Sequence, residues 1–396
     1  MTTGPGRTRL VTPTFAVVTA SALAYFVGIG MLIPTIPRFV VDVHGGGGVA
    51  VGVVTGAFAF TAAVLRPWAG RIGDRSGRRV LVLGGSAVLA GSYLLYVFAD
   101  GLLPLVLLRV VSGVGEAAMF VGAATAVQDL APAARSGEAA SYFSVAVYGG
   151  LGAGPPIGEA IQRAHGYDTV WVVAAAVTFV ATVLGWWTPV GTVSGATERR
   201  RLLNPAGLGP GAVLALSLSG LAAFTGFIAL YVDREGLGDA GPVFIVYGTL
   251  ILAIRIAGAR VADRFGAHRA ATFAIGCIAG GMVLMAAWPS RPGLYLATVV
   301  FALGMALQYP SLIRIVIEDT PDDQRSSAIA TFSIFFDLSQ GIGLFVLGGI
   351  VALGGERAAF LAAGALAGTA LLVLARLTAS RQSAGARAAH QASSRR

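Results

Sequence analysis

Two acidic residues of this 396-residue chain lie within long apolar stretches, where a carboxyl group can take up and release a proton. They are Glu116 in "RVVSGVGEAA" and Asp337 in "FSIFFDLSQGIG". An ionised carboxylate in an apolar span costs at least ~2.5 kcal/mol, so each needs a partner, a neutral form or a water-filled cavity. Arg109, two helical turns before Glu116, is too far away for direct contact, but water or substrate could bridge them, and a nearby arginine lowers the proton affinity of a carboxylate. We predict proton coupling at Glu116, Asp337 and Arg109; the alternative is a static ion pair that holds helices in register.

Membrane-spanning helices are the elements that must hold these charges. The chain is 56% hydrophobic and 12% charged, with a mean hydropathy of +0.77, which is typical of a polytopic membrane protein. At about 20 residues per span, the sequence predicts an all-α membrane protein with twelve helices. They cover approximately residues 13–37, 47–69, 80–99, 103–128, 139–162, 170–190, 207–232, 243–258, 271–288, 293–317, 327–352 and 357–377.

The distribution of arginine predicts how these spans are oriented. The net charge of +9 comes from arginine, since the chain has no lysine, and the arginines lie mainly between spans. With the N-terminus inside, nineteen arginines are cytoplasmic and five, including Arg38, lie in external loops, which predicts a multi-pass protein of the inner (cytoplasmic) membrane with both termini cytoplasmic. Counting about 1.5 Å per residue along its helix places Glu159 near the outer surface. All five tryptophans lie at predicted span ends, where indole rings favour the membrane interface. This arrangement favours the lipid bilayer, and not a nucleic acid, as the partner of the basic residues.

The scarcity of reactive side chains excludes several function classes. A single cysteine excludes a disulfide framework, and no cluster of residues indicates a metal site. Without lysine there is no Walker phosphate loop, which disfavours an ATP-driven pump. A membrane enzyme would need a clustered nucleophile, base or metal set, which the loop histidines do not supply. We therefore expect neither enzyme activity nor a cofactor, and the proton gradient as the energy source.

The chain also repeats itself at a constant offset of 189 residues. "LRPWAGRIGDRSGRR" from Leu65 matches "IRIAGARVADRFGAHR" from Ile254, and "FSVAVYGGLGAG" from Phe143 matches "FSIFFDLSQGIG" from Phe332. Two related six-helix halves are the sequence trace of a transporter built around a central site. The predicted domains are an N-terminal half at 1–190, a cytoplasmic linker at 191–206, a C-terminal half at 207–378 and a basic, disordered cytoplasmic tail at 379–396.

The segment "GRIGDRSGRR", residues 70–79, resembles the signature of the major facilitator superfamily between helices 2 and 3, and residues 259–268 resemble a degraded second copy. The span count and internal repeat extend this resemblance over the whole chain. "RVVSGVGEAA" is similar to the family's helix 4 pattern. "GLGAGPPIG", residues 150–158, is similar to the helix 5 pattern of proton-coupled exporters, with Glu159 in place of the usual next glycine. The chain thus resembles the 12-helix drug/proton antiporter group. The helix 5 residues that carry the packing and kink are Gly150, Gly154, Pro155 and Gly158.

The resemblance implies that residues 70–79 form a cytoplasmic gate and not a ligand site. Asp74 is expected to meet the cytoplasmic end of helix 11 near Ser327 and to interact with Arg71 or Arg75, and Asp263 is expected to play the matching part against helix 5. The gate residues so implied are Gly70, Asp74, Arg75, Gly77, Arg78 and Arg66 in the first half, with Asp263, Arg264 and Arg255 in the second.

A central cavity is expected to use aromatic and amide side chains at mid-membrane depth, namely Tyr25, Tyr148, Phe224, Phe227, Gln308 and Gln340. Such a cavity suits a bulky, largely hydrophobic solute. The leading hypothesis is a monomeric secondary transporter that works by alternating access and exports a drug-like or natural-product small molecule in exchange for protons. The alternatives are a proton-coupled symporter that imports a small nutrient and, more distantly, a membrane receptor or scaffold that does not transport.

Overall fold

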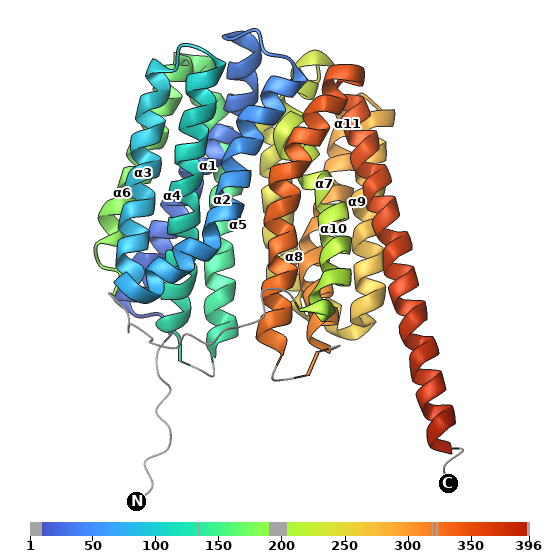
Figure 1. Cartoon of the computed structure of the whole chain (residues 1–396). Coiled ribbons are helices and arrows are strands. Elements are labelled where there is room, and N and C mark those ends of the chain that lie inside the picture. The colour runs from blue at the N-terminus through green and yellow to red at the C-terminus, as the bar shows by residue number, and fades with distance from the viewer. Residues whose placement is uncertain (1–9, 133–134, 190–203, 319, 322–323, 394–396) are drawn as a thin grey trace, which may run out of the picture. The chain divides into compact units, whose positions relative to one another are not determined.

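The structure is a computed structural model that describes residues 10–132, 135–189, 204–318, 320–321 and 324–393. The described residues form eleven α-helices and one short 3-10 helix, without a strand (Figure 1). The all-α architecture predicted from the sequence is therefore confirmed. The helices are α1 (Pro13–Asp42), α2 (Gly48–Ser76), α3 (Arg78–Leu95), η1 (Tyr96–Phe98), α4 (Leu102–Asp129), α5 (Ser136–His165), α6 (Tyr167–Gly185), α7 (Pro205–Arg234), α8 (Ala240–Phe265), α9 (Ala267–Ala287), α10 (Arg291–Glu318) and α11 (Arg325–Ser393).

The last helix, α11, covers two predicted spans. Its regular geometry is interrupted at Gly355, where φ is 74° and ψ is −177°, a backbone conformation that favours glycine. The break lies between the spans predicted at 327–352 and 357–377, so the described part of the chain contains twelve helical segments, in the predicted order. The final segment continues to Ser393.

Most of these helices can cross a membrane by length and composition. Nine helices in the described residues are long and apolar enough, among them one apolar stretch, Thr331–Ala379, that includes the break at Gly355. The apolar part of α8, Ala240–Arg255, is shorter. The multi-pass character predicted from hydropathy is thus carried by helices from both predicted halves.

The chain forms two compact units. One comprises Met1–Glu198 and Thr225–Leu252, and the other comprises Arg199–Phe224 and Ala253–Arg396. The sequence predicts the boundary between halves at residues 191–206, whereas the ends of α7 and α8 that adjoin their connecting loop are grouped with the first unit. Helices α7 and α8 therefore each contribute residues to both units.

Glycines allow α1 and α5 to pack closely within the first unit. A Cβ atom on Gly154 would lie 2.6 Å from the Cα atom of Gly30, and one on Gly150 would lie 2.8 Å from the backbone of Phe26. Gly158 meets the backbone of Met31 in the same way. The three glycines are spaced four residues apart, so they form one face of α5, the small-residue packing used between membrane helices. Helix α5 runs through Pro155 as one element.

Tryptophans follow the interface expectation with one exception. Trp68, Trp186, Trp187 and Trp288 are exposed, as membrane-interface residues are. Trp171 is fully buried, with its ring centroid 5.3 Å from that of Phe39 and 5.6 Å from that of Tyr96. Trp171 lies in the second turn of α6, at a span end as predicted, but its ring packs in this aromatic core and not on the outside.

The second unit is held by small residues and amide groups. Gly304 and Gly281 bring α10 against α9, since a Cβ on Gly304 would lie 2.5 Å from the carbonyl oxygen of Ala274. Ser217 on α7 accepts a hydrogen bond from the amide of Gln308 on α10. The buried Gln308 amide is thus hydrogen bonded inside the bundle, as an apolar surrounding requires.

Candidate functional site

The Glu116 carboxyl group lies inside the first unit and is paired with Arg66. The Nη2 atom of Arg66 is 3.1 Å from Oε1 of Glu116, and the side chain of Glu116 is 8% exposed. Glu116 is fourteen residues beyond Leu102, the first residue of α4, which corresponds to about 21 Å along the helix. Its second oxygen, Oε2, is buried without a hydrogen-bond partner among the described residues. An acidic group is thus held near the middle of a spanning helix with half of its hydrogen-bonding capacity unused.

Two buried tyrosines lie within electrostatic range of this carboxyl group. Tyr25 on α1 and Tyr93 on α3 are both fully buried, and both are electrostatic neighbours of Glu116. Their hydroxyl groups also have no hydrogen-bond partner among the described residues. Three buried polar atoms without partners in one neighbourhood are uncommon, because each costs about 1–3 kcal/mol of desolvation. These buried polar atoms make the surroundings of Glu116 the candidate functional site of the first unit.

Arg66 takes the place beside Glu116 that was expected for Arg109. Arg109 is 7% exposed, donates from Nε to the carbonyl oxygen of Val54 at 3.2 Å, and stacks on the ring of Phe58 at 4.3 Å. The sequence assigned Arg66 to the cytoplasmic gate, but in the structure its guanidinium group pairs with Glu116 and lies 4.3 Å from the ring centroid of Phe120. Arg66 was the residue that sequence reasoning missed here, although it lies within the apolar stretch "AFTAAVLRPWAG".

The expected cavity residues fall into different environments. In the second unit, Phe224 is fully buried against Phe301, Gln308 is bonded to Ser217, and the Gln340 amide donates to the carbonyl oxygen of Leu218 at 3.3 Å. Phe227 is fully buried in the first unit. The side chain of Asp337 lies outside the described residues. Of the expected cavity residues, Tyr25 is thus an electrostatic neighbour of Glu116, whereas Gln308 and Gln340 are hydrogen bonded within the second unit.

Tyr148 lines a groove of about 400 Å³ between α5 and α8. At its base the two helices nearly touch, since a Cβ atom on Gly248 would lie 2.7 Å from the Cα atom of Gly152. The lining is almost entirely apolar, and it comprises Tyr148, Gly149, Gly152, Ala153, Pro156, Ile157, Ile245, Gly248, Thr249 and Leu252.

The predicted gate segment is mostly helical. Helix α2 continues to Ser76, and only Gly77, with φ of 88°, turns the chain into α3. Asp74 therefore lies in the last turn of α2. Its carboxylate binds Arg78 at 2.9 Å, and Arg78 also binds Asp129 at the end of α4 at 3.1 Å.

The partner of Asp74 in this segment is thus Arg78, where Arg71 or Arg75 was expected. A Cβ atom on Gly70 would meet nothing within 4 Å, so this glycine makes no close approach in the structure. Arg255 is half-buried. The side chains of Asp263, Arg264 and Ser327 lie outside the described residues.

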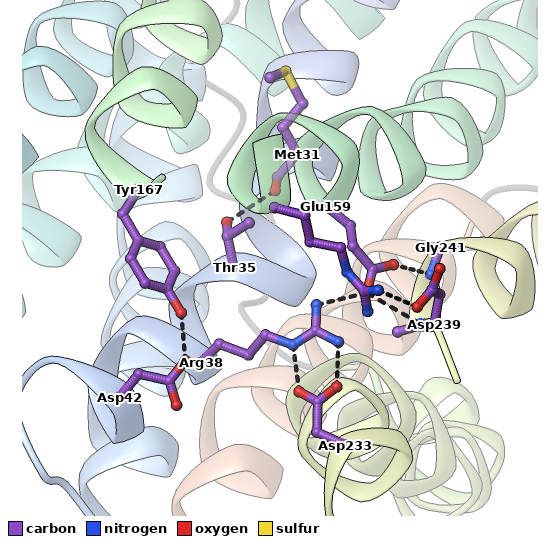
Figure 2. Close-up of polar contacts among 11 residues, drawn as sticks. Met31, Thr35, Arg38, Asp42, Glu159, Tyr167, Asp233, Asp239 and Gly241 are labelled. Atoms are coloured by element: carbon purple, nitrogen blue, oxygen red, sulfur yellow. Dashed lines mark hydrogen bonds and ion pairs between the residues drawn. The ribbon is translucent and has the colours of Figure 1, made fainter. Parts of the chain in front are cut away.

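A second buried ion cluster joins α1 and α5 to the adjoining ends of α7 and α8 (Figure 2). Arg38 binds Glu159 through Nη1 at 2.8 Å, and it binds Asp233 through Nε at 2.5 Å and Nη2 at 2.8 Å. Arg163 binds Glu159 at 3.0 Å and also binds Asp239. The side chains of Arg38 and Glu159 are 5% and 4% exposed.

Sequence reasoning placed Arg38 in an external loop and Glu159 near the outer surface. In the structure α1 continues to Asp42, so Arg38 lies within the helix and is buried. Two sequence features could have indicated this pair. One is the arginine that follows two prolines in "IPTIPR" at the end of the first span, and the other is Glu159, which stands where the helix 5 pattern has a glycine.

The sequence profile of the Major Facilitator Superfamily matches residues 18–293 and 243–395 of this chain. The chain belongs to this superfamily. It is similar to an uncharacterized MFS-type transporter of Salmonella typhimurium strain LT2, with 27% identity over 360 residues, 88% of this chain and 92% of that protein. It is also similar to an uncharacterized MFS-type transporter of Burkholderia mallei strain SAVP1, with 29% identity over 366 residues, 87% of this chain and 88% of that protein.

Solved structures share the fold of this superfamily member. A bacterial homolog of the human lysosomal transporter Spinster superposes with a TM-score of 0.77 at 14% identity, covering 93% of this chain and 96% of that one. The nucleoside transporter NupG superposes with a TM-score of 0.76 at 12% identity, covering 92% and 99%. The human organic anion transporter MFSD10 gives 0.70 at 17% identity, covering 92% and 100%.

Membership in the superfamily establishes the general activity. This chain is a multi-pass secondary transporter of a small-molecule substrate, and not an enzyme. The buried carboxyl group, the two arginines and the two tyrosines of the first unit therefore belong to a transport protein.

Proposed function

We propose that this transporter exports a drug-like or natural-product small molecule in exchange for protons, and that Glu116 carries the coupling proton. The observation that carries the proposal is the burial of Glu116 near the middle of α4 with Oε1 on Arg66 and Oε2 without a partner in the described residues. A carboxyl group placed in this way has Arg66 as its counter-ion while it is ionised, and it loses that charge when it takes up a proton.

The ionised and the protonated forms of Glu116 need different interaction partners. The ionised carboxylate is compensated by the guanidinium group of Arg66. When Glu116 takes up a proton, the ion pair is lost and Oε2–H becomes a donor, for which we propose a phenol oxygen of Tyr25 or Tyr93 as the acceptor after a movement of the side chains. Protonation therefore exchanges one set of interactions between α2 and α4 for another between α4, α1 and α3. A change of helix contacts that follows the proton is what coupling to alternating access requires.

The character of the substrate is proposed from the residues around this centre. Phe58, Phe120 and Phe26 lie with the two tyrosines near the arginines and Glu116, and the groove beside Tyr148 is almost entirely apolar. Aromatic and aliphatic surface of this kind favours a bulky, largely hydrophobic solute. The direction of transport is proposed from the likeness of residues 150–158 to the helix 5 pattern of exporters. Asp337 stays a second candidate for the proton.

A susceptibility screen tests this function. Cells with and without the protein are exposed to a panel of amphiphilic antibiotics and dyes, with and without an uncoupler. We expect protection against one or more compounds that the uncoupler removes. Increased susceptibility would instead indicate import, and an unchanged profile across the panel would contradict the proposed substrate class.

Glu116→Gln then tests the proton site in everted vesicles, by the release of protons on addition of the compound that the screen identifies. We expect this variant to lose proton release and protection while remaining folded in the membrane. Glu138→Gln is the matched control, because Glu138 is 43% exposed and pairs with Arg135, three residues away on the protein surface. Undiminished proton release by Glu116→Gln would refute the assignment of Glu116.

A further inference from the structure

The cluster around Arg38 and Glu159 is more than a surface ion pair. Arg38 binds two carboxylates at once, and its contact with Asp233 is bidentate, the geometry in which guanidinium and carboxylate groups bind most strongly (Figure 2). Because Arg38 and Glu159 are both almost fully buried, their attraction is little screened by water or salt. Removing Arg38 or Glu159 would leave the other as an unpaired buried charge, so the intact cluster stabilises the contact between its helices.

Glu159 is the centre of this cluster. Besides Arg38 and Arg163, its carboxylate accepts hydrogen bonds from the backbone N–H groups of Ala240, at 3.2 Å, and Gly241. These N–H groups are the free donors of the first turn of α8, where a negative charge also favours the helix dipole. One carboxylate from α5 therefore binds α1 and the start of α8 together, and it does so at the position where the sequence departs from the glycine of the helix 5 pattern.

The cluster is continuous with a close contact between α5 and α8. Gly152, Pro156 and Glu159 lie along one side of α5, and they meet Gly248 and Gly241 on α8. The ionic contacts thus lie at one end of a helix pair whose backbones approach closely farther along. This explains why Thr225–Leu252 is grouped with residues 1–198 and not with the remainder of α7 and α8.

A permanent fastening at this place is incompatible with alternating access. In a transporter built from two repeats, one repeat moves against the other, so contacts between them at each end of the pathway must form and break. With the six-plus-six division that the sequence predicts, α1 and α5 belong to the first repeat and α7 and α8 to the second. Arg38 lies at the end of α1 that leads into α2, whereas Asp74 lies about 40 Å farther along α2, at the opposite end of the unit.

We propose that the Arg38–Glu159–Asp233 cluster closes the external end of the transport pathway, and that Glu159 is a gating residue whose contacts break once in each cycle. The carboxylate is suited to this because all of its partners, two arginines and two backbone N–H groups, are polar groups that water can replace when the end opens. The rival interpretation is a permanent brace that only stabilises the fold.

Spin labels at Arg163→Cys and Asp239→Cys distinguish the two, in a Cys277→Ala background that removes the native thiol. Arg163 and Asp239 are in contact and half-exposed, so labels there report separation of α5 from the start of α8 without replacing Arg38, Glu159 or Asp233. We expect strong dipolar broadening in the electron paramagnetic resonance spectrum of the closed form. Adding Glu159→Gln should raise the unbroadened fraction several-fold, with unchanged far-ultraviolet circular dichroism and size-exclusion profile.

The matched control is the pair Arg314→Cys and Glu318→Cys, which are in contact at 2.7 Å and lie four residues apart on α10. Its broadening should not respond to Glu159→Gln. Asp233→Asn is a milder second variant, because the ion pair between Arg38 and Glu159 remains. It should raise the unbroadened fraction less than Glu159→Gln does. Dipolar broadening that stays the same in both variants would overturn the proposed gate. Separation of the labels that occurs only together with loss of the folded protein would also overturn it, because a permanent structural brace behaves in that way.

Discussion

The Nη2 atom of Arg66 lies 3.1 Å from the Oε1 atom of Glu116, and this pair joins α2 to α4 inside the first unit. Arg109 on α4 makes a further polar contact between the same helices, to the carbonyl oxygen of Val54 on α2. A buried ion pair is weak evidence for added stability, because desolvation of the two charges offsets their attraction. Its retention inside a membrane protein is therefore better explained by the protonation chemistry proposed for Glu116.

The energetic coupling of this pair gives the first prediction. Arg66→Gln removes the cation and leaves the Glu116 carboxylate unpaired, which costs about 3–5 kcal/mol for a buried pair. The double variant Arg66→Gln/Glu116→Gln removes both charges and should recover much of that loss. Thermal denaturation of the purified protein in detergent measures the difference. A double variant no more stable than Arg66→Gln alone would contradict the pairing.

The two carboxylates on Arg78 give the second prediction. Asp74 and Asp129 bind the same guanidinium group, and their side chains are similarly exposed, 57% and 51%. Of these two carboxylates, the resemblance to the superfamily signature assigns a gating role to Asp74 and not to Asp129. Asp74→Asn should therefore impair transport without changing substrate preference, whereas Asp129→Asn should have a much smaller effect. The compound identified by the susceptibility screen serves for both, and a shifted substrate profile in Asp74→Asn would indicate a binding role.

The order and approximate length of the helices could be predicted because hydropathy and span length act locally along the chain. Glu116 could be identified for the same reason, since a single acidic residue inside an apolar stretch is visible in one segment. Its partner could not, because Arg66 lies fifty residues away and was assigned by its nearness to the gate signature. Pairing across helices depends on rotation and depth of each helix, which the sequence of one helix does not contain.

The same limit applies to Arg38 and Glu159. Both were assigned to the external end by counting along their spans, and the structure adds that α1 extends to Asp42, which brings Arg38 inside the helix. The end of a spanning helix is poorly defined by hydropathy, because charged residues at the interface look like loop residues. Similarly, α2 extends through the gate signature to Ser76, so what was expected as a connecting loop is mainly the last turns of a helix.

Close packing of α5 on α1 gives the third prediction. Gly154→Ala would place a Cβ atom 2.5 Å from the carbonyl oxygen of Val27 and 2.6 Å from the Cα atom of Gly30, and both are backbone atoms that cannot turn away. Overpacking of this kind costs about 1–3 kcal/mol. Gly149→Ala, on the same helix, meets only the Cδ1 atom of Leu23 at 3.7 Å and should be neutral or stabilising, since alanine favours a helix. The apparent melting temperature should therefore fall in Gly154→Ala and stay the same or rise in Gly149→Ala. Equal melting temperatures of the two variants would exclude a tight contact at Gly154.

Two neighbouring tyrosines on α3 and η1 give the fourth prediction, because one hydroxyl group is satisfied and the other is not. The Tyr96 hydroxyl is hydrogen bonded to that of Ser112 at 2.7 Å, so Tyr96→Phe should lower stability by about 0.5–1.5 kcal/mol. The Tyr93 hydroxyl is buried without a partner among the described residues, so Tyr93→Phe removes a desolvated group and should leave stability unchanged or raise it.

If Tyr93 serves the proton on Glu116 as proposed, Tyr93→Phe should nevertheless slow proton release from everted vesicles, and Tyr96→Phe should not. A variant that is at least as stable as the unmodified protein but less active is expected when the lost hydroxyl group serves transport, because such a group is retained in spite of its desolvation cost. Loss of stability in Tyr93→Phe with normal proton release would show instead that the hydroxyl is a structural group with a partner in the folded protein.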